Sequence, residues 1–241
     1  MNFSKRIYDK ELLDREDIPA SDILQNMREL NTINHLLGGH TITLKGLKKI
    51  LSLTRATASE LHIVEIGSGG GDNLRVMQSF CKKHSIRARF TGIDINSNCI
   101  TSAKNKNPHA YIDYIHSNYK DVVFDEKPDI IFASLFCHHF NETSLVQMFQ
   151  WMYNNSKLGF FINDLQRHPI AYYAISVLTK LFSKSYLVKN DAPLSVRRAF
   201  SKQELEALSE LAGIPGHHIS WQWAFRFLLV ATHRSDQLEL L

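Results

Sequence analysis

The segment that most constrains the fold is residues 61–72, LHIVEIGSGGGD. Its first half, residues 62–66, is short, β-branched and mostly apolar, which is typical of a parallel strand buried between two layers of helices. Four glycines follow within five residues, and a backbone without Cβ atoms can turn tightly and come close to a ligand. The apolar residues of the next segment, 72–84, recur at helical spacing, with Asp72 near the helix start. The sequence therefore predicts a strand, a ligand-binding turn and a helix.

A glycine turn of this kind also serves nucleotides, flavins or a simple tight connection, so a second motif is needed. Residues 89–95, RFTGIDI, predict the next strand, and Asp94 stands where a doubly wound sheet directs a carboxylate at a ribose. The glycines follow the pattern G-x-G-x-G instead of the G-x-G-x-x-G of dinucleotide-binding folds. The two motifs together resemble those of class I S-adenosylmethionine (SAM)-dependent methyltransferases.

The resemblance implies a fold, a cofactor and a set of cofactor residues. The fold is α/β: a doubly wound, Rossmann-like, seven-stranded and mostly parallel sheet whose last strand is antiparallel. The cofactor is SAM, with S-adenosylhomocysteine (SAH) as product. Glu65 occupies the place of an acid near the cofactor's amino-acid end, Asp94 that of the ribose-binding acid, and Asn118 that of a side chain facing the adenine. The implied cofactor residues are Glu65, Gly67, Ser68, Gly69, Gly71, Asp94, Ile95, Asn118 and Phe136.

The remaining strands follow at regular distances along the chain. We expect them at residues 111–116, 128–136 and 158–164, and the closing antiparallel pair at 218–223 and 225–231. Helices connect them, including one over 142–153. Ser201 and Glu204 form a capping box at the start of a late helix.

With 241 residues, of which 44% are hydrophobic, the chain suffices for one core. We expect residues 1–60 to form an N-terminal helical cap and residues 61–241 the SAM-binding domain, with a helical substrate insertion at about 165–200. In the cap, Ser21 is the expected N-cap of a first helix, and a second helix covers 44–53 after a loop at 40–43. An open alternative is that these helices only cover an edge of the sheet.

The insertion holds the candidate substrate residues. Residues 171–182, AYYAISVLTKLF, predict a helix that is apolar almost all round, so it must be buried under the cap, face a lipophilic ligand or contact lipid. Residues 187–200 predict a loop. The candidates for substrate binding are Tyr172, Tyr173, Arg197 and Arg198; the alternatives are core aromatic residues and a solvated arginine pair.

Three histidines are candidate general bases. The segment FCHHFNE, residues 136–142, resembles the fourth-motif loop of plant phenolic O-methyltransferases, in which His138 would be the base. His139 and His168 are the other candidates, and packing of the loop is the structural alternative. No histidine pair has the i, i+4 helical spacing with a carboxylate that typifies a metal site, so we expect no metal.

Composition excludes several function classes. The net charge of +4 is dispersed, which argues against nucleic acid as a partner. The three cysteines lie far apart, as free thiols in a reducing compartment do. The first residues lack the apolar core of a secretion signal, and no run reaches the ~20 apolar residues of a membrane span. We therefore expect a cytoplasmic monomer or homodimer, with peripheral membrane contact left open.

The function follows from these features. The segments LNTINHLLGGH and NDLQRHPIAYY are similar to those of bacterial small-molecule methyltransferases associated with polyketide or quinone pathways. We therefore expect O-methylation of a lipophilic phenolic small molecule with a histidine base. The alternatives are a C-methyltransferase of quinone biosynthesis and, from another class, a non-catalytic regulator that binds SAM or a partner.

Overall fold

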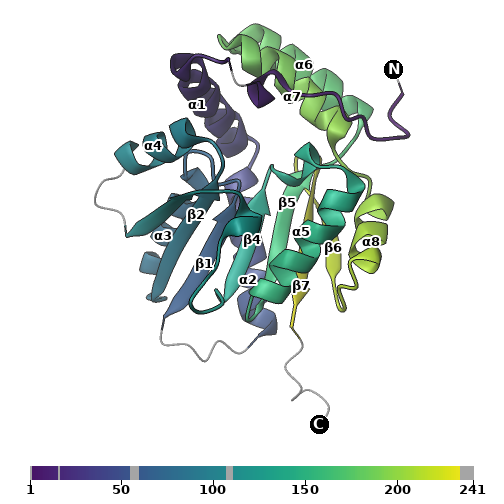
Figure 1. Cartoon of the computed structure of the whole chain (residues 1–241). Helices are drawn as coiled ribbons and strands as arrows, with labels where there is room; N and C mark the ends of the chain where they lie inside the picture. The colour runs from purple at the N-terminus through teal and green to yellow at the C-terminus, as the bar shows by residue number, and fades with distance from the viewer. Residues whose placement is uncertain (1, 16, 55–59, 107–110, 234–241) are drawn as a thin grey trace.

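The computed structural model describes residues 2–15, 17–54, 60–106 and 111–233, and these form a seven-stranded sheet between layers of helices (Figure 1). The strand order is β3-β2-β1-β4-β5-β7-β6. Within the sheet, β7 runs antiparallel to both its neighbours, and the other strand pairs are parallel. The predicted fold class is confirmed.

The strands are β1 (Leu61–Ile66), β2 (Ala88–Asp94), β3 (Ile112–His116), β4 (Ile130–Ser134), β5 (Gly159–Leu165), β6 (His218–Gln222) and β7 (Arg226–Thr232). The α-helices are α1 (Ala20–Leu36), α2 (Gly39–Leu53), α3 (Asp72–Lys83), α4 (Ser97–Lys106), α5 (Glu142–Asn155), α6 (Pro169–Phe182), α7 (Tyr186–Arg198) and α8 (Lys202–Leu211). Short 3₁₀ helices are η1 (Leu12–Asp14), η2 (Tyr119–Asp121) and η3 (Cys137–His139).

Both faces of the sheet are buried. Helices α2 and α3 cover one face, where Ile63 and Phe132 belong to a core cluster with their apolar side chains. Helices α5 and α8 cover the other face, where Val64 and Ile131 lie (Figure 1). This two-sided burial explains why the central strands read as continuous apolar runs.

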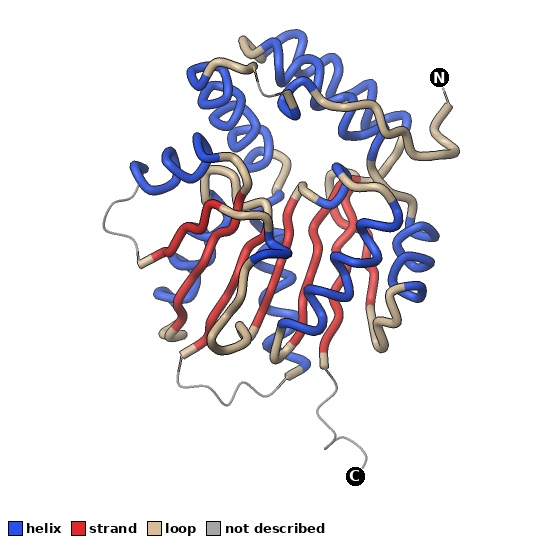
Figure 2. The backbone as a smooth tube through the Cα atoms, viewed as in Figure 1, coloured by secondary structure: helices blue, strands red, loops and turns tan. Residues whose placement is uncertain are grey.

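Beyond the carboxyl ends of the parallel strands lies a helical layer formed by α1, α6 and α7 (Figure 2). Helices α6 and α7 pack against each other, and α7 also contacts α1 and η1. By contrast, α2 packs directly on β5 and β7. Thus, within residues 1–60, α1 lies over the strand ends, whereas α2 is part of the layer on one face of the sheet.

Two boundaries in the N-terminal helices differ from the prediction. Residues 40–43, predicted as a loop, are the first part of α2. Their β-branched side chains disfavour a helix, but Ile42 and Thr43 are buried, and tertiary packing outweighs that weak preference. In addition, α1 starts directly after Pro19, which takes the N-cap position, so Ser21 lies inside the helix and is not its cap.

The predicted loop in the insertion is wrong as well, because residues 186–198 form helix α7. The Ser185 side chain caps this helix by accepting a hydrogen bond from the Val188 N–H. Pro193 lies inside the helix, where it removes one main-chain hydrogen bond. Burial of the apolar side of α7 outweighs that loss. The proline made this segment read as a loop from sequence.

Other predictions are confirmed. The capping box of Ser201 and Glu204 is present at the start of α8. The three cysteines are free and buried. In the part of the chain that the structure describes, no helix is long and apolar enough to cross a membrane.

Candidate functional site

The glycine turn follows β1 and has the backbone geometry that requires glycine. Gly67 has a φ of 69° and Gly71 a φ of 70°, in the left-handed region that side chains disfavour. A Cβ atom on Gly67 would collide with the ring of Phe136, and one on Gly71 with the hydroxyl of Tyr114. No other residue type fits these two positions without movement of their neighbours.

Asp94 ends β2 and binds the glycine turn. Its carboxylate accepts hydrogen bonds from the main-chain N–H of Gly69 and of Asn96, both at 2.8 Å. Burial raises the pKa of Asp94 above its ordinary value, while these two hydrogen bonds act in the opposite direction. The carboxylate therefore fixes the turn to the end of the next strand and remains able to accept further hydrogen bonds from a ligand.

Glu65 is a buried acid with an unused oxygen. Its Oε1 accepts a hydrogen bond from Asn73 Nδ2 at 2.8 Å, and its Oε2 has no partner among the described residues. Burial raises the pKa of Glu65 well above its ordinary value. A buried carboxyl oxygen without a donor is rare unless a ligand supplies one, and the ammonium group of a bound SAM is such a donor. The buried hydroxyl of Ser68 also lacks a partner.

The other predicted cofactor residues surround the same edge of the sheet. Ile95 directly follows Asp94 and is 70% exposed, which leaves it available to a planar ligand. Asn118 follows β3, is exposed and accepts a hydrogen bond from the Lys120 N–H through its side chain. Phe136 follows β4 and lies against Gly67. Cofactor binding by Ile95 and the contact of Asn118 with the adenine stay predictions.

His138 and Asp164 form a buried pair where β4 and β5 end. The Nδ1 atom of His138 lies 2.7 Å from Asp164 Oδ1, and the other carboxylate oxygen accepts the main-chain N–H of His138. Burial alone would raise the pKa of Asp164, but the charge and hydrogen bonds of His138 lower it below the ordinary value. With the ring proton on Nδ1 in this contact, Nε2 would be the acceptor.

Glu11 was missed by sequence reasoning. This buried side chain of the N-terminal segment lies 3.8 Å from His138 Nε2 through Oε1 and 3.8 Å from His139 Nε2 through Oε2. Burial raises the pKa of Glu11, and the neighbouring His139 lowers it. The sequence carried no signal for this contact, because Glu11 is far from both histidines along the chain and belongs to no motif.

These three side chains could also hold a metal ion. Each of Glu11, His138 and His139 offers a ligand atom within 4.8 Å of the others, and two histidines with one carboxylate are a common donor set. The predicted absence of a metal rested on helical spacing, which does not detect ligands brought together by the fold. It stays a prediction.

The remaining candidates fall into different surroundings. His168 caps α6 by accepting the Ile170 N–H at its Nδ1 atom, and its ring stacks on Phe225. Tyr172 and Arg197 line a common hollow of about 140 Å³ together with Asn190, Pro193 and Leu194. Tyr173 is 58% exposed on another side of α6. The structure brings Tyr172 and Arg197 together at this hollow, and the ring of Tyr173 lies edge-on to that of Tyr172 with 5.3 Å between ring centroids.

Arg198 is neither solvated nor open to a substrate. It is buried, and its guanidinium donates to the main-chain carbonyls of Asp9, His138 and His139. Arg6 reinforces it by donating to the carbonyls of His138 and Arg198. These two arginines hold the histidine loop against α7 and the N-terminal segment, so the alternative of a solvated arginine pair is wrong for Arg198.

Comparison with known proteins identifies the segment that contains the glycine turn and Asp94. Residues 63–159 match the family model described as a methyltransferase domain. This segment of the chain is therefore similar to SAM-dependent methyltransferase domains, and SAM is the cofactor that such domains use. The match favours an enzyme over the alternative of a non-catalytic regulator.

Solved structures share the fold at low sequence identity. The plantazolicin methyltransferase BpumL in complex with SAH is 16% identical, with a TM-score of 0.64 over 90% of this chain and 92% of that one. Human N-acetylserotonin methyltransferase in complex with SAM is 15% identical, with a TM-score of 0.60 over 89% of this chain and 56% of that one. Magnesium protoporphyrin IX methyltransferase from Synechocystis PCC 6803 with bound SAH is 12% identical, with a TM-score of 0.55 over 89% of this chain and the whole of that one. No curated protein matches the sequence.

Proposed function

We propose that the protein transfers the methyl group of SAM to a phenolic oxygen of a lipophilic small molecule, with His138 as the general base. The observation that carries this proposal is the 2.7 Å contact between His138 Nδ1 and Asp164 Oδ1 at the carboxyl ends of β4 and β5. Ligands of open parallel sheets bind at this edge, and an imidazole held by a carboxylate is a common arrangement for proton abstraction.

The two carboxylates beside His138 define where a proton would go. A phenol has an ordinary pKa of about 10, so its oxygen must lose a proton before or during methyl transfer. His138 Nε2 accepts that proton, and the imidazolium is then stabilised by Asp164 at Nδ1 and by Glu11, 3.8 Å from Nε2.

SAM supplies an electrophilic methyl group when bound, so the remaining task of the chain is alignment. We assign Glu65 to the amino group of the cofactor, because its Oε2 lacks a partner, and Asp94 to the ribose hydroxyls. The acceptor oxygen must then be held about 3–3.5 Å from the methyl carbon. We assign that role to the helical layer formed by residues 1–60 and 165–200.

A lipophilic acceptor is supported by the composition of that layer. Helix α6 presents apolar side chains, and Tyr172 shares a hollow with Arg197, which suits an aromatic ring carrying an anionic substituent. The names of the structural neighbours, an N-acetylserotonin methyltransferase and a magnesium protoporphyrin IX methyltransferase, support a small-molecule acceptor in general terms.

The test is a methylation assay with a panel of alkylated phenols and quinone precursors. We expect methyl ethers as products, and His138→Ala should reduce kcat by ~10²-fold or more. Asp164→Asn should also reduce kcat, because the His138 ring would lose its negative partner. His218→Ala, at an exposed histidine of β6, is the matched control and should have the wild-type rate.

Each alternative gives a different result. Carbon methylation of quinone precursors with full retention of rate in His138→Ala would favour the C-methyltransferase. A loss confined to His139→Ala or His168→Ala would move the base to that residue. Loss of activity on chelation, restored by a divalent metal, would replace the base by a metal at Glu11, His138 and His139. Reaction with thiols or amines alone would contradict oxygen as the acceptor atom.

A further inference from the structure

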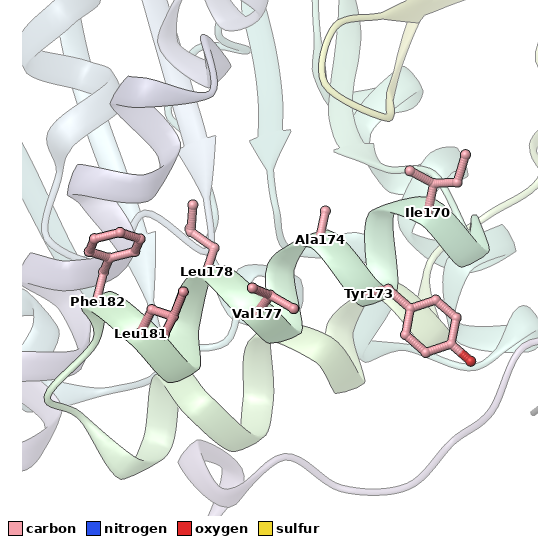
Figure 3. Close-up of a pocket in the computed structure, with 7 residues that line it drawn as sticks. All are labelled: Ile170, Tyr173, Ala174, Val177, Leu178, Leu181 and Phe182. Carbon is pink, nitrogen blue, oxygen red and sulfur yellow. The ribbon is translucent and has the colours of Figure 1, made fainter.

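Helix α6 has one face that packs and one that does not. Ala171 and Thr179 are buried on the side that faces α7. On the opposite side, large apolar residues recur at helical spacing and remain exposed: Ile170 at 62%, Tyr173 at 58%, Val177 at 57%, Leu181 at 71% and Phe182 at 78%. Together with Ala174 and Leu178, these residues line an open hollow of about 550 Å³ (Figure 3). We call these seven residues the α6 apolar face.

The α6 apolar face continues onto the turn between β6 and β7. His168, which caps α6, stacks on Phe225 of that turn with 4.9 Å between ring centroids. Trp223 in the same turn is 70% exposed, and Trp221 at the end of β6 is 52% exposed. Contiguous exposed apolar area of this kind marks an interaction surface. Tryptophan and tyrosine beside it are typical of side chains at a membrane interface.

Around the α6 apolar face, three exposed lysines outnumber the acidic side chain of Glu29, which accepts hydrogen bonds from Ser183, Lys184 and Ser185 at the end of α6. Lys180, Lys184 and Lys189 are all exposed. The acidic residue of the α6–α7 pair, Asp191, is buried and accepts the main-chain N–H groups of Leu12 and Leu13. The buried carboxylate of Asp191 therefore adds no negative charge to the exposed surface of these two helices. An apolar helix face with a lysine rim fits anionic lipid headgroups above an acyl layer.

We propose that the α6 apolar face, with Trp223 at its end, docks the protein on the surface of an anionic lipid bilayer. A second copy of the chain is a poorer occupant, because a two-fold interface would bring the same lysine rim against itself. A small molecule alone is also poorer, because side chains exposed by more than half along the length of a helix do not enclose a ligand. The described helices include none that spans a membrane, so the contact is interfacial.

Docking in this way would give a bilayer-dissolved acceptor a short path to the site. In Figure 3, Ile170, Ala174 and Leu178 project from the side of α6 turned toward the strands, whose carboxyl ends carry the site residues Asp94 and Asp164. The docking itself does not depend on which atom is methylated. Only this advantage for a lipophilic phenol rests on the proposed function.

The test is co-sedimentation of the full chain with vesicles of phosphatidylcholine, with or without phosphatidylglycerol. We expect binding to vesicles that contain phosphatidylglycerol and release by salt, since the headgroup attraction is screened. The double variant Val177→Asp with Leu181→Asp should bind at least ~10-fold more weakly, because charges replace the apolar side chains that enter the interface. Val123→Asp is the matched control, since Val123 is 91% exposed outside α6 and should bind as the wild type does.

Calorimetric titration with SAH separates these effects from misfolding, because the double variant should retain wild-type affinity for SAH. Absence of binding to phosphatidylglycerol vesicles would overturn the proposal, as would equal binding by the double variant and the wild type. A dimer in sedimentation analysis that the double variant abolishes, with no vesicle binding by either protein, would assign the face to a second copy. None of these readouts requires methyl transfer.

Discussion

The cofactor side and the acceptor side of the molecule are assembled in different ways. On the cofactor side, the decisive contacts join consecutive elements of the chain, as between Asp94 and Gly69 or between Glu65 and Asn73. On the acceptor side, contacts join the two ends of the chain, as between Arg6 and the carbonyl of Arg198. The first side therefore depends on backbone turns within neighbouring strands, whereas the second depends on individual buried charged side chains.

Arg167 illustrates the second kind of assembly. It directs two nitrogens at the carboxylate of Glu204, both at 2.8 Å, and donates to the carbonyls of Phe3 and Ala199. One guanidinium thus connects the N-terminal segment, the end of β5 and α8. Such planar, bidentate contacts to a carboxylate are a geometry that only arginine provides. Loss of such arginine contacts should therefore loosen the acceptor side without affecting the cofactor side.

The largest effect that would confirm this separation is expected from Asp94→Ala. Loss of the carboxylate would remove the proposed ribose contact and leave the N–H groups of Gly69 and Asn96 without their acceptor. We expect affinity for SAH to fall by ~10²-fold, since each hydrogen bond to a charged group is worth about 1.5–3 kcal/mol. Calorimetric titration measures this loss, and Asp113→Ala, at an exposed carboxylate of β3, is the control. Affinity within twofold of wild type would remove Asp94 from the cofactor site.

Sequence reasoning was most accurate on the cofactor side, for a physical reason. A left-handed turn needs glycine at particular positions, so Gly67 and Gly71 predict the turn from the sequence. The buried strands β1 and β4 likewise show as apolar runs. The residues that the motifs brought into register, such as Asp94 and the glycines, were therefore found together at one edge of the sheet.

On the acceptor side the same reasoning failed where long-range packing determines the local structure and the side-chain contacts. Helix α7 was missed because Pro193 is a poor helix residue, and because its neighbours besides α6, namely α1, η1 and η3, come from distant segments. Glu11 was missed because nothing in its own segment distinguishes it from a surface acid. The histidine pair was recognised by its motif, but its partners Asp164 and Glu11 become evident only when the chain is folded.

A second prediction concerns the acceptor side alone. Asp191 accepts the N–H groups of Leu12 and Leu13 at 2.8 and 3.0 Å, so Asp191→Ala should release the N-terminal segment. Loss of these charge-assisted bonds should favour local opening by about 2 kcal/mol, detected as faster amide hydrogen exchange at Leu12 and Leu13. Affinity for SAH should remain unchanged if the two sides are independent. A parallel loss of SAH affinity would show that they are coupled.

One chain of contacts does cross between the two sides. Asn73 donates to Glu65 of β1, and its own side-chain oxygen lies 2.9 Å from Nδ1 of His40 in α2. His40 Nε2 in turn lies 3.0 Å from the side-chain oxygen of Asn31 in α1. The orientation of Glu65 thus depends on the N-terminal helices. Because of this path, we expect changes in the N-terminal helices to affect the cofactor side through Glu65.

Glu65 also gives the smallest of the expected effects, a pH dependence of cofactor binding. Burial raises the pKa of Glu65 in the free protein, whereas a bound ammonium group favours the carboxylate and lowers that pKa. Protonation therefore competes with binding: affinity for SAH should be constant above the raised pKa and fall by up to ~10-fold per pH unit below it. Calorimetry in buffers of different ionisation enthalpy should detect proton release on binding near that pKa, and Glu65→Gln should abolish the release. Proton release that persists in Glu65→Gln would assign the titration to another group, whereas its shift in His40→Ala would measure how strongly the N-terminal helices act on the cofactor side.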